Sequence, residues 1–253
     1  MEGDNHDSHD SHSLEGRRIL VAGATGGLGS VTVRALCRAG AEVILSGRDT
    51  AKLDTLGRAL PRATSVAADL NDPEGPEHLA SAVGELDGFV YAAGLAPVAP
   101  LRFLRDSDLD AAFAVNTLAP LRLTRALLRG KRLRRGASLV WFSSLAAARG
   151  AAGYTAYAAS KAALEGAARC LALELAPKAM RVNCIAAGMI RGALASEGGE
   201  RFSEASLQAH FDRYPLGEGG AGDVAAATRF LLSGASRWTT GTVLPVDGGF
   251  SAQ

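Results

Sequence analysis

The amino-acid sequence predicts a single α/β domain built on a doubly wound, mostly parallel sheet of seven strands with helices on both faces. Apolar, strand-like runs recur along the chain, and helical patterns separate most of them, which is the alternation typical of a parallel sheet. A length of 253 residues with 47% hydrophobic residues suits one core of this kind. The runs fall near residues 18–22, 41–46, 64–67, 87–92, 137–143, 181–186 and 242–246.

The first unit is a strand that leads directly into a glycine turn and a helix. After the strand at 18–22, Gly23, Gly27 and Gly29 follow with the spacing G-x3-G-x-G, and a helical pattern covers 31–39. The N–H groups and the dipole of a helix that begins at such a turn attract a phosphate, and glycines allow its close approach. The unit therefore predicts a dinucleotide phosphate site; the alternative is a glycine-rich turn without a ligand.

The second unit ends at Gly47 and Arg48, near where an adenosine ribose would lie in such a fold. An acidic residue at this place would accept from a ribose 2′-hydroxyl and would repel a 2′-phosphate. Here Gly47 leaves space and Arg48 offers a planar set of donors suited to phosphate. The pair favours NADP(H) over NAD(H). A surface arginine ahead of the helix predicted at 51–60 is the alternative interpretation.

The third and fourth strands contribute further residues to the same edge of the sheet. Their connection carries two prolines and a glycine at 72–76, so we expect only a stub of helix there. Ligands of doubly wound sheets bind at the carboxyl ends of the strands. Residues expected to converge at this edge are the glycine turn, Asp69, Gly94, Ser144 and Gly188.

The stretch from Ser144 to Lys161 has the pattern S-x12-Y-x3-K and follows the fifth strand. Tyr157 and Lys161 lie four apart in an alanine-rich, helical run, which places their Cβ atoms about 5–6 Å apart on one face. A nearby ammonium favours the phenolate, so the pKa of Tyr157 is expected to fall below its usual value of about 10. Such a phenol exchanges a proton with a carbonyl or an alcohol, and Ser144 can hold the same oxygen. Alone, a Tyr-x-x-x-Lys pair is more often a solvated pair.

Together these motifs resemble the short-chain dehydrogenase/reductase family in its branch of roughly 250 residues, which implies a Rossmann-type domain. The resemblance covers about residues 16–250. The matching positions are Gly23, Gly27 and Gly29 in the cofactor turn, Asp69 and Leu70 after the third strand, Asn116, Ser144, Tyr157 and Lys161 at the catalytic positions, and residues 240–249 in the closing strand and turn.

The resemblance implies a role for each catalytic position. Tyr157 would be the general acid and base, and Lys161 would lower its pKa and bind the nicotinamide ribose. Ser144 would orient and polarise the substrate carbonyl, and Asn116 would hold a water that links Lys161 to solvent. The alternatives are a helix-kink role for Asn116 and a loop-cap role for Ser144. The expected cofactor set is Gly23, Thr25, Gly27, Leu28, Gly29, Arg48, Asp69, Leu70, Ala93, Gly94, Tyr157, Lys161, Gly188 and Ile190.

Several positions depart from the family pattern. Ala22 replaces the usual Thr or Ser before the turn. Residues 91–94 read Tyr-Ala-Ala-Gly, where the family commonly has Asn-Asn-Ala-Gly or Asn-Ala-Gly, so an amide that ties the sheet to the cofactor turn is missing. Ala187 and Gly192 replace the Pro and Thr of a Pro-Gly-x-x-x-Thr motif, which removes a hydroxyl that normally grips the nicotinamide carboxamide. These changes bear on cofactor affinity and leave the four catalytic positions intact.

A long irregular segment at about 189–222 follows the sixth strand, with a candidate helix at 203–214. In the family this segment is the substrate lid, and long loops at this edge are usually functional. Phe202, Leu207, Phe211 and Tyr214 give it an apolar face. Either this apolar face meets substrate, or it packs the lid onto the body of the domain.

Composition argues against several other classes of protein. A formal net charge of +1 gives no general affinity for nucleic acid or anionic membrane. Cys37, Cys170 and Cys184 lack the spacing of metal ligands, and we expect core thiols in a reducing compartment and no metal site. Without a secretory signal or an apolar run of spanning length, a cytoplasmic protein is expected.

The polar start of the chain is expected to be a disordered tail over residues 1–15, ahead of a catalytic domain at 16–253. The start carries His6, His9 and His12 at intervals of three, which could bind a metal weakly. A solubilising tail is the favoured interpretation.

The sequence therefore predicts an NADP(H)-dependent oxidoreductase that interconverts a ketone and a secondary alcohol, with a 3-oxoacyl thioester as the leading substrate. The resemblance places Arg135 and Lys178 near the carrier-binding basic residues of acyl-carrier-protein reductases, so the substrate would be a small or a carrier-bound carbonyl compound. Residues 129–135 form a basic cluster that includes Arg135, and the alternative interpretation is that this cluster is a solvated helix end. The resemblance also implies a homotetramer or homodimer through helices near 116–130 and 157–176. The alternative function is a cofactor-binding sensor or scaffold without turnover.

Overall fold

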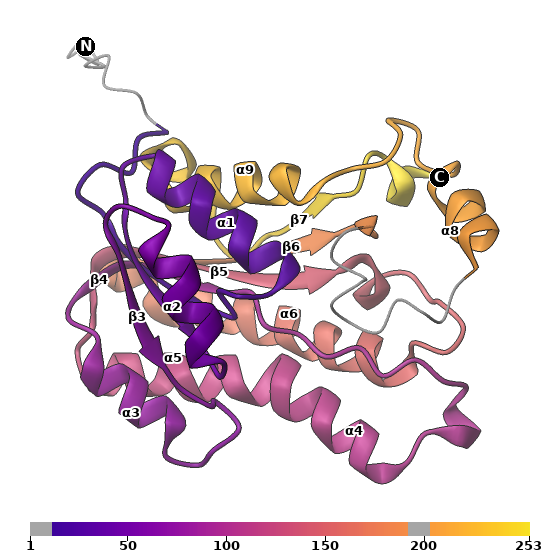
Figure 1. Cartoon of the computed structure of the whole chain (residues 1–253), viewed down its shortest axis with the longest axis horizontal. Coiled ribbons are helices and arrows are strands. Elements are labelled where there is room, and N and C mark those ends of the chain that lie inside the picture. The colour runs from indigo at the N-terminus through magenta and orange to yellow at the C-terminus, as the bar shows by residue number, and fades with distance from the viewer. Residues whose placement is uncertain (1–11, 192–202) are drawn as a thin grey trace.

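The computed structural model describes residues 12–191 and 203–253, and in this part of the chain seven strands form one parallel sheet (Figure 1). The strand order is β3-β2-β1-β4-β5-β6-β7, which confirms the doubly wound fold class. The predicted strands agree within one residue at each end except β5, which begins four residues earlier. The strands are β1 (Arg18–Ala22), β2 (Glu42–Gly47), β3 (Ala63–Ala67), β4 (Leu86–Tyr91), β5 (Leu133–Ser144), β6 (Arg181–Ala187) and β7 (Val243–Val246).

Helices cover both faces of the sheet. The helices are α1 (Gly27–Arg38), α2 (Thr50–Arg58), α3 (Gly75–Ala82), α4 (Asp106–Phe113), α5 (Ala119–Arg129), α6 (Thr155–Leu175), α8 (Glu204–Phe211) and α9 (Ala221–Leu232). Figure 1 shows α1 and α9 on one side of the sheet, with α3, α5 and α6 on the other. The eight residues of α3 make about two turns, which confirms the predicted stub.

Alternating side chains of the strands build one apolar core on each face. In β1, Ile19 and Val21 join the core beneath α1, α2 and α9, whereas Leu20 joins the core beneath α3, α5 and α6. This alternation follows from the two-residue period of a strand. Because every strand runs in the same direction, their carboxyl ends meet at one edge, where the site is built.

The amino-terminal boundary of the domain lies earlier than predicted. Leu14 is fully buried in the core beneath α1, and its N–H donates to the carbonyl of Ala39. Glu15 forms an ion pair with Arg62 at 2.6 Å. The packed domain therefore begins before residue 16, while His6, His9 and the rest of the predicted tail up to residue 11 lie outside the described residues.

The three cysteines differ in burial. Cys184 lies in β6 and is fully buried, and burial raises the pKa of its thiol to about 12. Cys37 is half-buried, and Cys170 is exposed on α6. The prediction of core thiols is therefore wrong for Cys170. Within the described ranges, no helix has the length and apolar character needed to cross a membrane.

Candidate active site

The glycine turn between β1 and α1 packs closely against the end of β4. Gly23 has a φ of +82°, and a Cβ at this position would collide with the backbone nitrogen of Ala93. A Cβ at Gly29 would collide with the carbonyl oxygen of Gly23. The first turn of α1 is Gly-Leu-Gly-Ser and its N-cap is Gly26, so the positive end of the helix lies among small, uncharged residues. This geometry suits a diphosphate.

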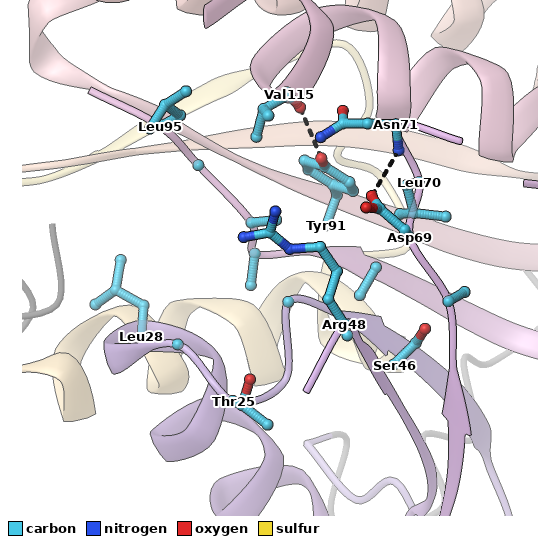
Figure 2. Close-up of a pocket in the computed structure, with 18 of the residues that line it drawn as sticks. Thr25, Leu28, Ser46, Arg48, Asp69, Leu70, Asn71, Tyr91, Leu95 and Val115 are labelled. Carbon is cyan, nitrogen blue, oxygen red and sulfur yellow. Dashed lines mark hydrogen bonds between the residues drawn. The ribbon is translucent and has the colours of Figure 1, made fainter. Parts of the chain in front are cut away.

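A cavity of about 490 Å³ opens in front of this turn and is bordered by the carboxyl ends of β2, β3 and β4 (Figure 2). Its volume lies within the usual range for a ligand site. The predicted cofactor residues that line it are Gly23, Thr25, Gly27, Leu28, Arg48, Asp69, Leu70, Ala93 and Gly94. Gly29, Gly188, Ile190, Tyr157 and Lys161 are not among its lining residues.

The far end of the cavity carries the groups predicted to meet adenosine. Figure 2 shows Arg48, an exposed residue, extending across the cavity toward Tyr91. Asp69 accepts a hydrogen bond from the Asn71 N–H at 3.0 Å, which fixes the loop after β3. Ser46 lines the cavity with a buried hydroxyl that has no hydrogen-bond partner among the described residues. A positive side chain and an unpaired hydroxyl fit a phosphorylated ribose.

Sequence reasoning missed several lining residues, namely Ser46, Asn71, Tyr91, Leu95 and Val115. Ser46 directly precedes Gly47 and Arg48 at a strand end, which is a positional signal that could have identified it. Tyr91 stood out only as a departure from the family pattern. Val115 gave no signal, because a valine inside a helical pattern is ordinarily a core residue.

Tyr157 and Lys161 lie on one face of α6, as their spacing predicts. The ammonium of Lys161 is 5.8 Å from the centroid of the Tyr157 ring. Lys161 is only 2% exposed, and its Nζ donates to the carbonyl of Phe142 at 2.7 Å. Ser144 follows Phe142 by two residues at the end of β5, and its Oγ accepts the N–H of Ala146. The end of β5 thus presents Ser144 and holds Lys161.

A second contact joins the end of β5 to α6. The hydroxyl of Ser143 donates to Oε1 of Glu165 at 2.6 Å. Glu165 lies one turn after Lys161 on the same helix, and a hydrogen bond to a carboxylate is stronger than one between neutral groups. The strand end and the helix that carry the predicted catalytic residues are therefore joined at two points.

Asn116 is buried in a π-helical turn, Ala114–Leu118, between α4 and α5. Its Oδ1 accepts the Leu95 N–H at 2.9 Å, and its Nδ2 donates to the carbonyl of Leu95 and to Ser160 Oγ. A Cβ placed on Gly94 would lie 3.6 Å from both Asn116 Oδ1 and Lys161 Nζ. The structure thus brings Asn116 and Lys161 close to the same glycine. The water between Asn116 and Lys161 stays a prediction.

The segment after β6 is covered by residues from the predicted lid. The Met189 N–H donates to the hydroxyl of Tyr214 at 2.8 Å, and a Cβ on Gly188 would lie 2.9 Å from the Tyr214 ring. Phe211 and Tyr214 are 3% and 6% exposed, so these two residues pack the lid onto the body. Ile190 is also buried, and its contact with the cofactor stays a prediction. Phe202 and Gly192 lie outside the described residues.

Comparison with known proteins identifies relatives along nearly the whole chain. Residues 23–251 match a family model described as enoyl-(acyl carrier protein) reductase. L-xylulose reductase from Mesocricetus auratus is 38% identical over 94% of this chain and 97% of its own length. A 3-oxoacyl-[acyl-carrier-protein] reductase from Rickettsia prowazekii is 33% identical over 93% of this chain and 97% of its own.

A solved structure gives the same result at the level of the fold. A gluconate 5-dehydrogenase from Burkholderia cenocepacia, crystallised in complex with NADP and tartrate, has a TM-score of 0.89 at 25% identity. The match covers 96% of this chain and 98% of that one. Since relatives are matched almost end to end and the Tyr-Lys pair stands beside the end of β5, the chain belongs to the short-chain dehydrogenase/reductase family of oxidoreductases.

Proposed function

We propose that the protein is an NADP(H)-dependent oxidoreductase that interconverts a ketone and a secondary alcohol. The observation that carries this proposal is the arrangement of Lys161 and Tyr157 on α6 beside Ser144 at the end of β5. It places a phenol, an ammonium and a hydroxyl at the carboxyl edge of the sheet, which is where ligands of such sheets bind. The nicotinamide cofactor supplies or accepts the hydride when it is bound.

The side chains of this chain handle the proton and the oxygen of the substrate. The phenol of Tyr157 donates a proton to the carbonyl oxygen during reduction, and the charge of Lys161 favours the phenolate that remains. The oxygen of Ser144 accepts the Ala146 N–H, so its hydroxyl hydrogen can be directed to the substrate oxygen. A donor aimed at the oxygen where negative charge develops lowers the barrier.

NADP(H) is the proposed cofactor because the residues present fit its phosphates. The glycine turn and the start of α1 would hold the diphosphate, Arg48 would pair with the 2′-phosphate, and Asp69 and Leu70 would contact adenine. Tyr157 and Lys161 would meet the nicotinamide ribose, and the backbone at Gly188 and Ile190 the nicotinamide. The NADP bound to the Burkholderia relative supports this choice.

A 3-oxoacyl thioester is the first proposed substrate. The Rickettsia relative supports it, and so does the connection from β4 to α4, which begins beside Asn116 and exposes apolar side chains. Leu101 and Phe103 in this connection are 58% and 65% exposed. A small open-chain ketose is the second candidate, favoured by the L-xylulose reductase from Mesocricetus auratus.

The location of the basic residues argues against a carrier that docks beside the site of the same chain. Arg135 donates to the carbonyl of Pro177, so Arg135 and Lys178 do lie near each other. They lie at the amino end of β5, however, and Ser144 is nine residues farther along this strand, about 30 Å away. Arg134 in the same cluster is paired with Glu85 and Asp87. A free thioester or a small ketone therefore fits this chain better.

The proposed assembly is a homodimer or homotetramer that pairs through α5 and α6. Among the exposed residues of α6, four with uncharged and mostly small side chains follow one stripe: Ala159, Ala163, Cys170 and Leu173. Leu173, the largest of these side chains, is 78% exposed. Small residues allow two such helices to approach closely.

The first experiment is NADPH oxidation, with NADH as the control, against four substrates: a 3-oxoacyl thioester, L-xylulose, a simple ketone and an enoyl thioester. We expect NADPH-selective turnover of at least one carbonyl substrate, and the preferred one identifies the substrate class. The enoyl thioester is included because of the description of the matching family model. If NADPH binds and every substrate is inert, the reductase proposal fails and the sensor or scaffold role is favoured.

A further inference from the structure

We infer that Tyr91 is a positioning residue that holds the π-helical turn carrying Asn116. This inference rests on the proposed reductase chemistry, in which Asn116 serves the replacement of protons at Lys161. Tyr91 stands where the family commonly has an asparagine, and it reaches the turn through the backbone of Val115 (Figure 2).

The π-helical turn removes both regular helical partners of one carbonyl group. The N–H of Ala119 donates to the carbonyl of Ala114, five residues earlier, instead of to that of Val115. In this π register, the N–H that would donate to the carbonyl of Val115 belongs to residue 120, which is a proline and has no N–H. The carbonyl of Val115 is thus released from the helix ladder, as is common where a helix contains a π-bulge.

Tyr91 supplies the missing donor. Its hydroxyl donates to the carbonyl of Val115 at 2.6 Å, and its side chain is 1% exposed at the last position of β4. Burial raises the pKa of this phenol above its usual value, so it remains protonated, and able to donate, throughout the physiological range. The hydrogen bond is partly buried, and a carbonyl shielded from water is costly when it has no partner.

The hydrogen bond acts on the site through Asn116, the next residue in the turn. Both polar atoms of the Asn116 amide bind the backbone of Leu95, and Leu95 follows Gly94, which lies close to both Asn116 and Lys161. If the turn shifts to find another donor for Val115, Asn116 moves relative to Lys161. Tyr91 therefore sets the geometry between these two residues without touching the substrate.

The test begins with Tyr91→Phe, which removes the hydroxyl and keeps the ring that lines the cavity. We expect kcat to fall about tenfold, the dissociation constant of NADPH to stay within about twofold, and the pH profile of kcat to shift. The matched control is Ser138→Ala. Ser138 is also 1% exposed, and its hydroxyl donates to the carbonyl of Leu231 at 2.7 Å, away from the site. This control is expected to leave kcat and its pH profile unchanged.

A rescue variant separates positioning from general destabilisation. Pro120→Ala introduces an N–H five residues after Val115, where a π-register hydrogen bond can form. In the Tyr91→Phe background we expect Pro120→Ala to restore most of the lost kcat. In the wild-type background it is expected to change kcat less than about twofold.

Two results would overturn the inference: unchanged kcat in Tyr91→Phe, or an equal loss of kcat in Ser138→Ala. If the wild-type protein turns over none of the substrates, the proposed function fails, and hydrogen exchange still tests Tyr91. Amides of residues 114–121 should then exchange at least about tenfold faster in Tyr91→Phe than in Ser138→Ala. Equal exchange rates in the two variants would show that Tyr91 does not hold the turn.

Discussion

Lys161 is a nearly buried cation whose surroundings compensate for its removal from water. Burial alone disfavours an ammonium group, but the carbonyl of Phe142 accepts from it at 2.7 Å and the Tyr157 ring lies 5.8 Å away. The positive charge is therefore held at a fixed place beside the phenol. At the residue scale, the proposed chemistry depends on this pair, and the cofactor preference depends on Arg48.

Replacing Tyr157 with Phe is expected to lower turnover by at least about 10²-fold, because the proton donor is lost while the ring remains. The dissociation constant of NADPH should stay within about twofold. Stopped-flow or steady-state oxidation of NADPH measures the first quantity, and fluorescence titration measures the second. An unchanged melting temperature serves as the control for folding, and retained turnover would disprove the role assigned to Tyr157.

Replacing Arg48 with Ala should weaken NADPH binding by about 10- to 100-fold, which is the loss of affinity expected when a charge-assisted hydrogen bond to phosphate is removed. Binding of NADH should change by less than about threefold. Lys52→Ala is the matched control, because Lys52 is an exposed cation in the first turn of α2, paired with Asp49 at 3.2 Å. Equal losses for the two cofactors in Arg48→Ala would show that Arg48 does not recognise the 2′-phosphate.

At the scale of the elements, apolar runs were enough to predict the strands, but local pattern did not reveal every boundary. The start of β5 contains Arg134, Arg135 and Gly136, so it has no apolar signal, and pairing of Leu133 with Leu86 extends the strand there. The π-helical turn around Asn116 also escaped prediction. Its Val115 carbonyl accepts a hydrogen bond from Tyr91, which is 24 residues away from Val115 in sequence.

The part of the candidate site that depends on spacing within one element could be predicted from the sequence. The spacing of Tyr157 and Lys161 predicted one helix face, and the structure confirms it. The contacts of Lys161 with Phe142 and of Ser143 with Glu165 join α6 to the end of β5, which is a separate element in the sequence. No local pattern contains them.

The glycine turn offers a test of one element. Gly23→Ala should abolish NADPH binding and lower the melting temperature, because φ is +82° and a Cβ would collide with Ala93. Gly26→Ala is the matched control, since its φ is −73° and its nearest neighbour would be Gly23 O at 3.4 Å. Isothermal titration and thermal melts of the two variants give the comparison. Similar losses in both would show that the close packing of Gly23 is unimportant.

At the scale of the whole molecule, the carboxyl edge of the sheet is covered by segments from distant parts of the chain. Tyr214 stacks on Phe250 with ring centroids 4.7 Å apart, and Arg149, from the loop after Ser144, donates to the carbonyl of Phe250. The last residues of the chain are thus joined both to the segment after α8 and to the loop between β5 and α6. Substrate would enter through an edge assembled from three separate segments.

The proposed assembly gives a prediction at this scale. Ala163→Arg places a long cation in the exposed stripe of α6, so we expect it to reduce the molecular mass in solution to that of a monomer. Ala51→Arg, on the exposed side of α2, is the matched control and should leave the mass unchanged. Light scattering after size-exclusion chromatography measures both. A monomeric wild-type protein would contradict pairing through α6.

The position of the last residues matters for how the protein is handled in the laboratory. Gln253 donates to the carbonyl of Arg213, and the chain ends beside α8 (Figure 1). The first described residue, His12, lies instead against Phe230 of α9. A purification tag or surface linker fused after Gln253 would start beside Arg213, the residue before Tyr214. A fusion ahead of the domain lies away from the carboxyl edge of the sheet. Enzyme immobilised by its amino-terminal side should therefore show higher turnover than enzyme immobilised after Gln253.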